Sequence, residues 1–274
     1  MGILLDEEQI WQSYRDKPRI IDDRFLQDIP WEQLRRPPES VVAVIRYMRD
    51  VEMYSHDIFF DELTKTPSGR DPILSRFIHR WSEEETRHGE LFSRMLRQWQ
   101  PDDSSYQRPA STLTGRLYSF WICLLENACG EYFKTLHMVW GAINELATKE
   151  GYRALLDRWD DPVFTHIVRA IVQEEGRHAG FYLQMARLRL HRSPMAARFC
   201  RGMVERFWRP VGQWDKQPEE IEAVINLFRE NGFTGFEKNV SVKIQQYLQP
   251  LGALQLTSIL KKQVGPERSA VPAV

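Results

Sequence analysis

Two stretches of the sequence, WSEEETRHGELF at residues 81–92 and QEEGRHAGFY at residues 173–182, contain the same pattern, E-E-x-R-H. The pattern occupies Glu84–His88 in the first stretch and Glu174–His178 in the second. In each copy a glutamate and a histidine interrupt a regular series of apolar residues. Because a buried lone carboxylate is costly unless it is paired or binds a metal, these two stretches decide how the chain folds.

The apolar residues around each copy follow the spacing of an amphipathic helix. Around the first copy they are Leu74, Phe77, Ile78, Trp81, Phe92 and Met95. Around the second they are Phe164, Ile167, Ile171, Tyr182 and Met185. Steps of three and four residues stay on one helix face. They place Glu85 with His88, and Glu175 with His178, in inward-facing positions.

The other residues of the pattern suggest supporting roles. Glu84 and Glu174 lie beside the inward pairs, where a carboxylate can accept the second ring N–H of a histidine and fix its tautomer. Arg87 and Arg177 can neutralise such acids. A single E-E-x-R-H is also typical of a charged helix surface. Two copies, each filling a gap in an apolar face, favour a buried site.

Composition narrows the function classes. The chain has 274 residues, 42% hydrophobic and 27% charged, with a net charge of −1. These values favour a globular protein and give no sign of a nucleic-acid or membrane partner. The sequence predicts neither a signal peptide nor a membrane span, so we expect a cytoplasmic protein. With three cysteines, no C-x-x-C and no dinucleotide or Walker motif, redox chemistry would need a metal and an external electron donor.

Helical periodicity predicts an all-α fold with a four-helix core and additional C-terminal helices. Its long helices are expected at about 38–64, 72–98, 112–148 and 162–192, with a short helix or turn between 149 and 161. The second and fourth open with Asp71-Pro72 and Asp161-Pro162, an N-cap followed by a first-turn proline. The predicted organisation comprises an irregular lead-in (1–37), the bundle (38–192), a helical extension packed on it (193–262) and a disordered tail (263–274).

Two Glu-x-x-His helices supply half of a carboxylate-bridged dinuclear metal site. The other half is one glutamate from each of two further helices. Four carboxylates would balance the charge of two divalent ions, and oxygen with imidazole ligands suits iron or manganese. In the first helix Glu52 continues the apolar face of Val41, Ile45 and Met48, better than Asp50 or Glu62 do.

The third helix offers two glutamates within LLENACGEYF, residues 124–133. Glu126 shares a face with Cys129 and Phe133, and Glu131 points roughly 140° away at about 100° per residue. We prefer Glu126 and keep Glu131 as the alternative. His137 is expected to be a satisfied core or edge histidine and not a ligand.

These motifs resemble the soluble acyl-acyl-carrier-protein desaturases, a diiron carboxylate family of the ferritin-like superfamily. WSEEETRHGELF is similar to that family's first Glu-x-x-His segment, and EEGRH to its second, where an aspartate is common at the position of Glu174. LENAC resembles the third-helix segment, in which a threonine near the oxygen pocket stands where this chain has Cys129. The resemblance covers roughly residues 41–185 and supports Glu126 over Glu131.

The resemblance implies a role for each matched residue. Glu85 and Glu175 would bridge two ions, with His88 and His178 as nitrogen ligands and Glu52 and Glu126 as terminal carboxylates. It further implies two iron ions cycling between Fe2+ and Fe3+, dioxygen as co-substrate, an external electron donor such as a ferredoxin, and a homodimer. The residues themselves do not separate iron from an iron–manganese pair.

The leading expectation is an oxygen-dependent desaturase of an acyl chain carried on acyl carrier protein. One alternative keeps the diiron site and makes the protein a hydroxylase or N-oxygenase of a small or carrier-bound substrate. Another is iron storage or peroxide handling of the ferritin and rubrerythrin type. Residues 187–209 carry seven arginines and one glutamate. This stretch is either a docking surface for the acidic carrier or a solvated helix end.

Overall fold

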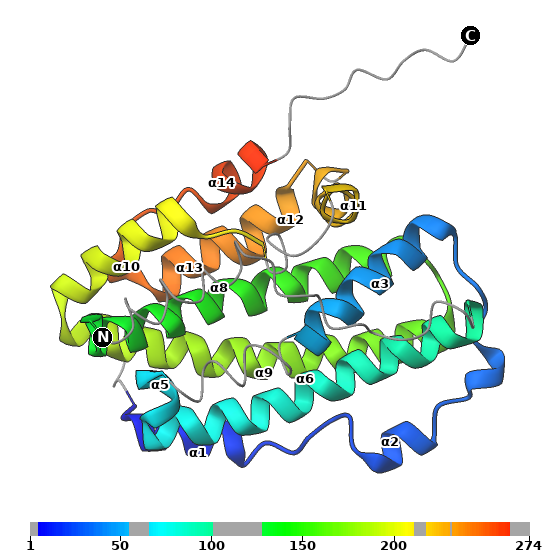
Figure 1. Cartoon of the computed structure of the whole chain (residues 1–274), viewed down its shortest axis with the longest axis horizontal. Helices are drawn as coiled ribbons and strands as arrows, with labels where there is room; N and C mark the ends of the chain where they lie inside the picture. Colours follow the sequence, from blue (N-terminus) through cyan, green and yellow to red (C-terminus); the bar gives the residue numbers. More distant parts are fainter. Residues whose placement is uncertain (1–4, 55–65, 101–127, 211–217, 231, 264–274) are drawn as a thin grey trace, which may run out of the picture.

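The computed structural model describes residues 5–54, 66–100, 128–210, 218–230 and 232–263. Every regular element in these ranges is a helix, which confirms the all-α prediction. The long helices are α3 (Glu39–Tyr54), α6 (Pro72–Trp99), α8 (Glu131–Leu156) and α9 (Pro162–Arg192). They lie side by side as two antiparallel pairs, α3 with α6 and α8 with α9 (Figure 1).

The starts of α6 and α9 are those that the sequence predicts. Asp71 accepts hydrogen bonds from the backbone N–H groups of Ile73 and Leu74, and a proline follows it at the first helical position. Asp161 caps α9 in the same way. An aspartate at the N-cap satisfies amides that have no partner within the helix, and proline there costs no hydrogen bond.

The third long helix differs from its prediction. It begins at Glu131, after Gly130 at φ 45°, and continues to Leu156. The segment KEGYRALL at residues 149–156, expected to form a separate short helix or turn, is the C-terminal part of α8. The predicted start near 112 lies outside the described residues, as do residues 55–65 at the predicted end of the first helix. Residues in the C-terminal half of α8, among them Glu145 and Tyr152, are therefore buried in the bundle.

The lead-in contains helices where irregular chain was expected. These are α1 (Glu7–Arg15), α2 (Asp23–Gln27) and the 3-10 turn η1 (Trp31–Gln33). In α1 Asp6 and Gln9 form a reciprocal capping box, which satisfies two free amides at the helix start. Ile10, Trp11 and Tyr14 are buried, and α1 packs on α6 and α9.

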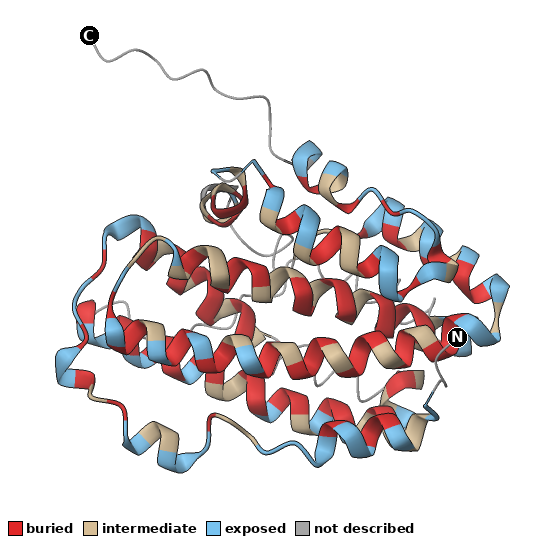
Figure 2. Cartoon of the chain, turned by 180° about the vertical axis from the view of Figure 1, so that it is seen from behind, coloured by how far each residue is buried: buried red, intermediate tan, exposed pale blue. Residues whose placement is uncertain are grey.

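Further helices cover one side of the bundle, above α8 in Figure 1. They are α10 (Pro194–Phe207), α11 (Pro218–Arg229), α12 (Thr234–Phe236), the π-helical turn η4 (Glu237–Ser241), α13 (Val242–Tyr247), η5 (Gln249–Leu251) and α14 (Leu256–Gln263). A short α5 (Pro67–Arg70) precedes α6. Buried residues run along the facing sides of the long helices and of this covering layer (Figure 2). One continuous apolar core joins the layer to the bundle.

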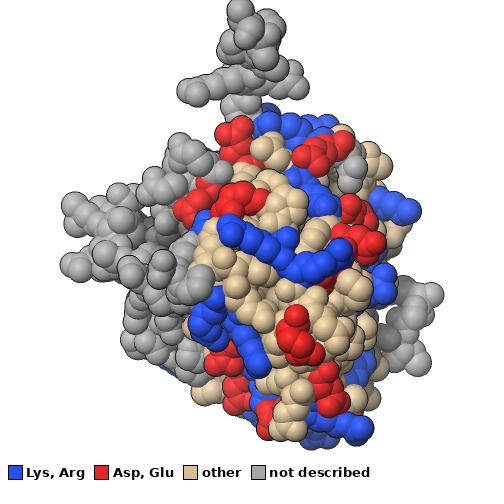
Figure 3. Space-filling view, turned by 90° about the vertical axis from the view of Figure 1, so that its right-hand side faces the viewer, with Lys and Arg blue, Asp and Glu red and all other residues tan. Residues whose placement is uncertain are grey.

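Basic and acidic side chains are interspersed on the end that lies to the right in Figure 1, seen face-on in Figure 3. None of the described helices is both long and apolar enough to cross a membrane.

Candidate metal centre

All four long helices place a glutamate at the same height in the bundle. Glu52 comes from α3, and Glu145 from α8. The helices α6 and α9 contribute the inward pairs of the repeated pattern, Glu85 with His88 and Glu175 with His178. Their side chains are all buried.

The six side chains form two overlapping groups, each able to hold a metal ion. In each group the possible ligand atoms lie within 4.8 Å of one another. The first group is Glu52, Glu85, His88 and Glu175, and the second is Glu85, Glu145, Glu175 and His178. Glu85 and Glu175 belong to both groups. A carboxylate has two oxygens, so each of these two glutamates can bridge a pair of ions.

Each histidine is held from the outside by the first glutamate of the other copy of the pattern. His178 Nε2–H donates to Glu84 at 2.8 Å, and His88 Nε2–H donates to Glu174 at 3.0 Å. An ionised carboxylate only accepts hydrogen bonds, so this arrangement fixes the proton on Nε2 and leaves the lone pair of Nδ1 facing the cluster. Glu84 and Glu174 thus each contact a histidine, as the sequence suggests, but it is the histidine of the other copy. We call them the outer carboxylates.

The inward-facing atoms fit a cation. Nδ1 of His88 and His178 and one oxygen each of Glu85 and Glu175 are buried without a hydrogen-bond partner. His178 Nδ1 nevertheless lies 2.9 Å from Glu85 Oε1, and His88 Nδ1 lies 3.3 Å from Glu175 Oε1. These close pairs do not have hydrogen-bond geometry, so unshared electron pairs converge on a common space. Only a cation or an added proton makes such an arrangement favourable.

Electrostatics support the same conclusion. Burial, together with the charges of Glu52 and Glu175, raises the pKa of Glu85 well above its ordinary value. Burial and the charge of Glu175 likewise raise the pKa of Glu145. Without metal, Glu85 and Glu145 therefore retain protons that a carboxylate normally loses at neutral pH. Divalent ions would replace those protons.

The outer carboxylates behave in the opposite way. Burial opposes ionisation of Glu84, but its hydrogen bond to His178 and the positive charges of His178 and Arg177 lower its pKa. Burial also opposes ionisation of Glu174, yet its hydrogen bond to His88 and the charge of His88 lower its pKa. Both are therefore ionised and able to orient the histidines at neutral pH.

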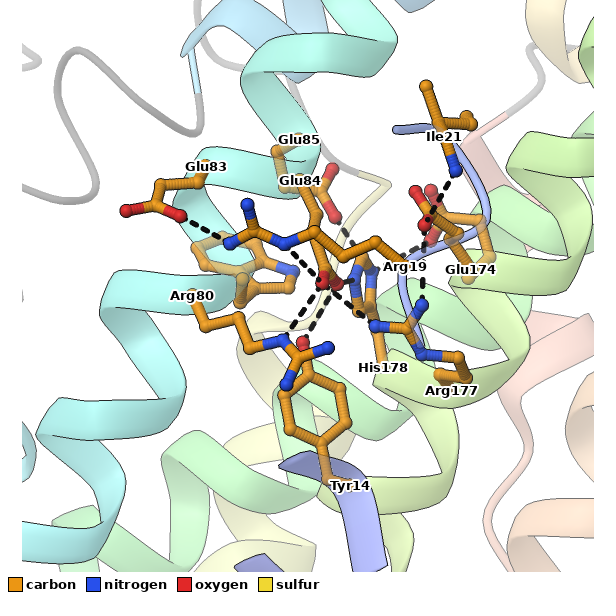
Figure 4. A network of polar contacts seen from close by, with 12 residues as sticks. Tyr14, Arg19, Ile21, Arg80, Glu83, Glu84, Glu85, Glu174, Arg177 and His178 are labelled. Carbon is orange, nitrogen blue, oxygen red and sulfur yellow. Dashed lines mark hydrogen bonds and ion pairs between the residues drawn. The ribbon is translucent and has the colours of Figure 1, made fainter. Parts of the chain in front are cut away.

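Arginines surround the outer carboxylates, although not all of those expected (Figure 4). Arg177 contacts both, at 2.8 Å from Glu84 and 3.2 Å from Glu174, as predicted. The same prediction for Arg87 is wrong, because Arg87 donates to the carbonyl oxygen of Ile21 at 2.9 Å and pairs with Asp23. Arg80 at 3.1 Å and Arg19 at 3.3 Å complete the positive charge around Glu84.

The terminal carboxylates have their own buried donors. Trp81 Nε1–H donates to Glu145 at 3.0 Å, and the hydroxyl of Tyr152 donates to Glu52. Tyr152 and Glu145 lie two turns apart on α8, so this helix both supplies one carboxylate and positions another. Neither Glu145 nor Tyr152 was among the residues that sequence reasoning selected.

A signal for Glu145 was present in the sequence. Met138, Ala142, Glu145 and Tyr152 follow one helix face, and the glutamate fills a gap in that apolar stripe as Glu85 and Glu175 do in theirs. In an antiparallel helix pair, residues equidistant from the turn lie opposite each other. For a turn at 157–161, Glu145 lies 12 residues before the turn and Glu175 lies 14 residues after it, so the two nearly satisfy this condition. Glu126 lies 31 residues before the turn and does not.

The other sequence candidates lie away from the cluster or outside the described residues. Glu126 and Glu62 are outside the described residues, and a role for Glu126 stays a prediction. Glu131 is exposed and pairs with Lys134 and Arg189. Cys129, half-buried before α8, is two residues from Glu131, which lies about 21 Å along the helix from Glu145 at 1.5 Å per residue. Cys129 therefore does not line the described cluster.

Neither Asp50 nor His137 belongs to either ligand group. Asp50 pairs with Arg49 next to it. His137 is buried and not part of either ligand group, as expected, but neither ring nitrogen has a hydrogen-bond partner. Burial and the charge of Arg189 lower its pKa to about 4, so it is a neutral core histidine and not a satisfied one.

Comparisons of the chain with protein-family models, curated proteins and solved structures found no match.

Proposed function

We propose that this protein is an oxygen-dependent diiron oxidoreductase that introduces a double bond into an acyl chain carried on acyl carrier protein. The observation that carries the proposal is the pair of ligand groups that share Glu85 and Glu175. Four buried carboxylates and two imidazoles match the ligand preference of iron, and the four carboxylates balance the charge of two divalent ions.

Two iron ions in this site would supply the activation of dioxygen and the oxidation of an unactivated C–H bond. The chain's own residues prepare the site for that chemistry. Glu84 and Glu174 fix the histidine tautomers, and the buried surroundings of the cluster exclude bulk water. Desaturation removes two hydrogens from adjacent carbons and reduces dioxygen to two waters. It consumes two electrons from an external donor and two protons.

The acyl substrate is supported by the motif resemblance more than by the site. A hydroxylase or N-oxygenase would use the same ligands, because loops and channels set the substrate. Iron storage or peroxide handling of the ferritin and rubrerythrin type is the third candidate. The product distinguishes these functions, since desaturation lowers the mass of the acyl chain by two hydrogens and hydroxylation adds one oxygen.

The test is a turnover experiment with iron-loaded protein, a ferredoxin-type reducing system, dioxygen and acyl carrier proteins that bear chains of different lengths. Mass spectrometry of the released chains should show loss of two hydrogens at one preferred length. Glu145→Ala should abolish this product, and Glu131→Ala, an exposed glutamate on the same helix, should not. An oxygenated product, or unchanged chains with iron accumulating beyond two ions per chain, would contradict the desaturase proposal.

A further inference from the structure

The N-terminal segment at residues 14–21 lies across the outer side of the cluster. We call this segment the strap. It comprises the last two residues of α1 and the chain that follows toward α2, and it contacts both outer carboxylates (Figure 4). These contacts join residues that are 70 and 154 positions apart in the chain, so the strap is placed by tertiary contacts and not by local sequence.

At Glu84 the two carboxylate oxygens have different partners. Oε1 forms ion pairs with Arg19, Arg80 and Arg177, all within 3.3 Å. Oε2 receives His178 Nε2–H at 2.8 Å and the hydroxyl of Tyr14 at 2.9 Å. Among the described strap side chains, Tyr14 is therefore the one that donates to the oxygen that also accepts the hydrogen bond from His178. Its ring is buried and packs against Phe181 on α9.

At Glu174 the strap acts through its backbone. The N–H groups of Ile20 and Ile21 donate to Oε1 at 2.7 and 3.2 Å, and Arg177 reaches the same oxygen. Oε2 receives His88 Nε2–H. Each outer carboxylate thus has one oxygen that faces a histidine and one that is anchored by amide or guanidinium groups.

The bundle in turn holds the strap by its carbonyl groups. Arg80 donates to the carbonyl oxygens of Arg15 and Lys17, at 2.6 and 2.9 Å. Arg177 donates to that of Pro18 at 3.0 Å, and Arg87 to that of Ile21. The first glutamate and the arginine of both E-E-x-R-H copies therefore fix the strap. This accounts for the repetition of residues that are not themselves candidate ligands.

We propose that the strap is part of the metal centre, with Tyr14 as a positioning residue for His178 and the amides of Ile20 and Ile21 as positioning groups for His88. Because the two contacts lead to different histidines, each supports a different ion of the pair. The strap then sets how long each ion is retained. This inference rests on the proposed two-metal site and not on the reaction that the site performs.

The test uses full-length protein loaded with two Co(II) ions, whose release to a chelator is followed by the visible absorption of bound cobalt. Tyr14→Phe removes only the hydroxyl. It should make one of the two ions leave roughly tenfold faster, within the range found when partners of metal-bound histidines are lost, and leave the other ion's rate unchanged. Tyr247→Phe, which alters an exposed tyrosine on α13, should change neither rate.

The second half of the test concerns the backbone. Ile20→Pro removes one amide donor to Glu174, and Ile20→Ala keeps it, so only the proline variant should accelerate the other ion. Circular dichroism checks that each variant is folded. Equal acceleration of both ions in the Tyr14 variant, or no acceleration in either Tyr14→Phe or Ile20→Pro, would overturn the inference. Failure of the unaltered protein to bind two ions would instead overturn the proposed function.

Discussion

Glu145 shows how a single residue changes the description of the site. It is buried in α8, accepts a hydrogen bond from Trp81 and belongs to the group around His178. Glu131 on the same helix has the same chemical group but is exposed and paired with Lys134. The helix face, not the residue type, separates a candidate ligand from a surface charge.

Replacing Glu145 should therefore remove one ion and not both. Glu145→Ala takes a carboxylate from the His178 group and leaves the Glu52 and His88 group intact, so metal content should fall from about two to about one per chain. Plasma mass spectrometry after removal of loosely bound metal measures this. Glu131→Ala should retain both ions. If Glu145→Ala retained both ions and Glu126→Ala lost one or both, Glu126 and not Glu145 would be the ligand, as the sequence alone predicts.

Most of the candidate ligands could be predicted because they interrupt the apolar face of a helix. The remaining one, Glu145, could not, because the end of its helix was misplaced. Glu52, Glu85, His88, Glu175 and His178 each continue an apolar face, and the structure brings them together. In the sequence, LLENAC favours Glu126 as the ligand from this helix, and Lys149-Glu150-Gly151 is typical of a helix end. Both patterns point away from Glu145. Packing overrides that local signal, since α8 passes through Gly151, beside Met48. The strap could not be predicted, because its contacts are far apart in sequence.

At the scale of elements, α8 and α9 are the most extensively packed pair among the helices that the structure describes. Gly141 on α8 permits this approach at one point. A Cβ placed there would lie 2.3–2.6 Å from atoms of the Tyr182 ring on α9, so even one methyl group would displace that ring. At Gly180, on α9, an added Cβ would meet no atom within 4 Å. The two glycines thus make a matched pair.

Substituting alanine should have opposite effects at these two glycines. Gly141→Ala should lower the free energy of unfolding by about 1–3 kcal/mol through overpacking. Gly180→Ala should raise it by about 0.5–1 kcal/mol, because alanine restricts the unfolded chain and favours helix. Urea unfolding of both variants in the same metal state gives the comparison. A stabilised Gly141→Ala variant would mean that α8 and α9 are not in close contact at Tyr182.

The arginines of residues 187–209 divide into two sets. Arg189 is buried between Glu7, Asp71 and Glu131, and Arg192 also pairs with Glu7, so both serve the fold. On α10, Arg201 pairs with Glu205 of its own helix, and Met195 and Phe207 are exposed. If carrier protein docks at this helix, the contact is made by α10 and not by the whole stretch.

Charge reversal tests that docking surface. Arg198→Glu with Arg201→Glu should raise the KM for the acidic acyl carrier protein severalfold with little change in kcat, because long-range attraction and contact are lost while the metal site is untouched. The control is Arg24→Glu, at an exposed arginine on α2, which lies on the opposite side of the bundle from α10 (Figure 1). An unchanged KM in the double variant would remove α10 as the docking surface.

At the scale of the whole molecule, neither helix pair completes the site alone. The α3–α6 pair supplies Glu52, Glu85 and His88, and the α8–α9 pair supplies Glu145, Glu175 and His178. Each ligand group nevertheless needs one bridging glutamate from the other pair. The outer hydrogen bonds cross between the pairs in the same way. Metal binding is therefore linked to the packing of the two halves.

This linkage predicts how stability depends on pH. In the metal-free fold the pKa values of Glu85, Glu145, His88 and His178 are all raised above their ordinary values. Burial opposes the histidine shifts, but the surrounding carboxylates, and for His178 also Tyr14, outweigh it. The folded chain thus holds protons that the unfolded chain releases above about pH 4.3 for the glutamates and about 6.5 for the histidines. Stability from these groups is present below those values and is lost as pH rises.

The free energy of unfolding of the metal-free protein should therefore fall between pH 5 and pH 9, and bound metal should suppress that fall by replacing the protons. Glu84, Glu174 and Glu175, whose pKa values are lowered, act in the opposite sense and lose their stabilising effect only below about pH 4.3. Urea unfolding across this range, with and without metal, tests the sign. Metal-free protein that becomes more stable from pH 5 to 9 would contradict the charge arrangement derived for the cluster.

The most direct test of the two-metal centre is metal content per chain, measured by plasma mass spectrometry on protein expressed with iron and manganese both available. The predicted result is about two iron ions per chain, with both lost in Glu85→Ala and in Glu175→Ala, because each removes a bridge between the ions. A folded, helical protein that carries no metal, or one ion that is indifferent to both substitutions, would contradict the account.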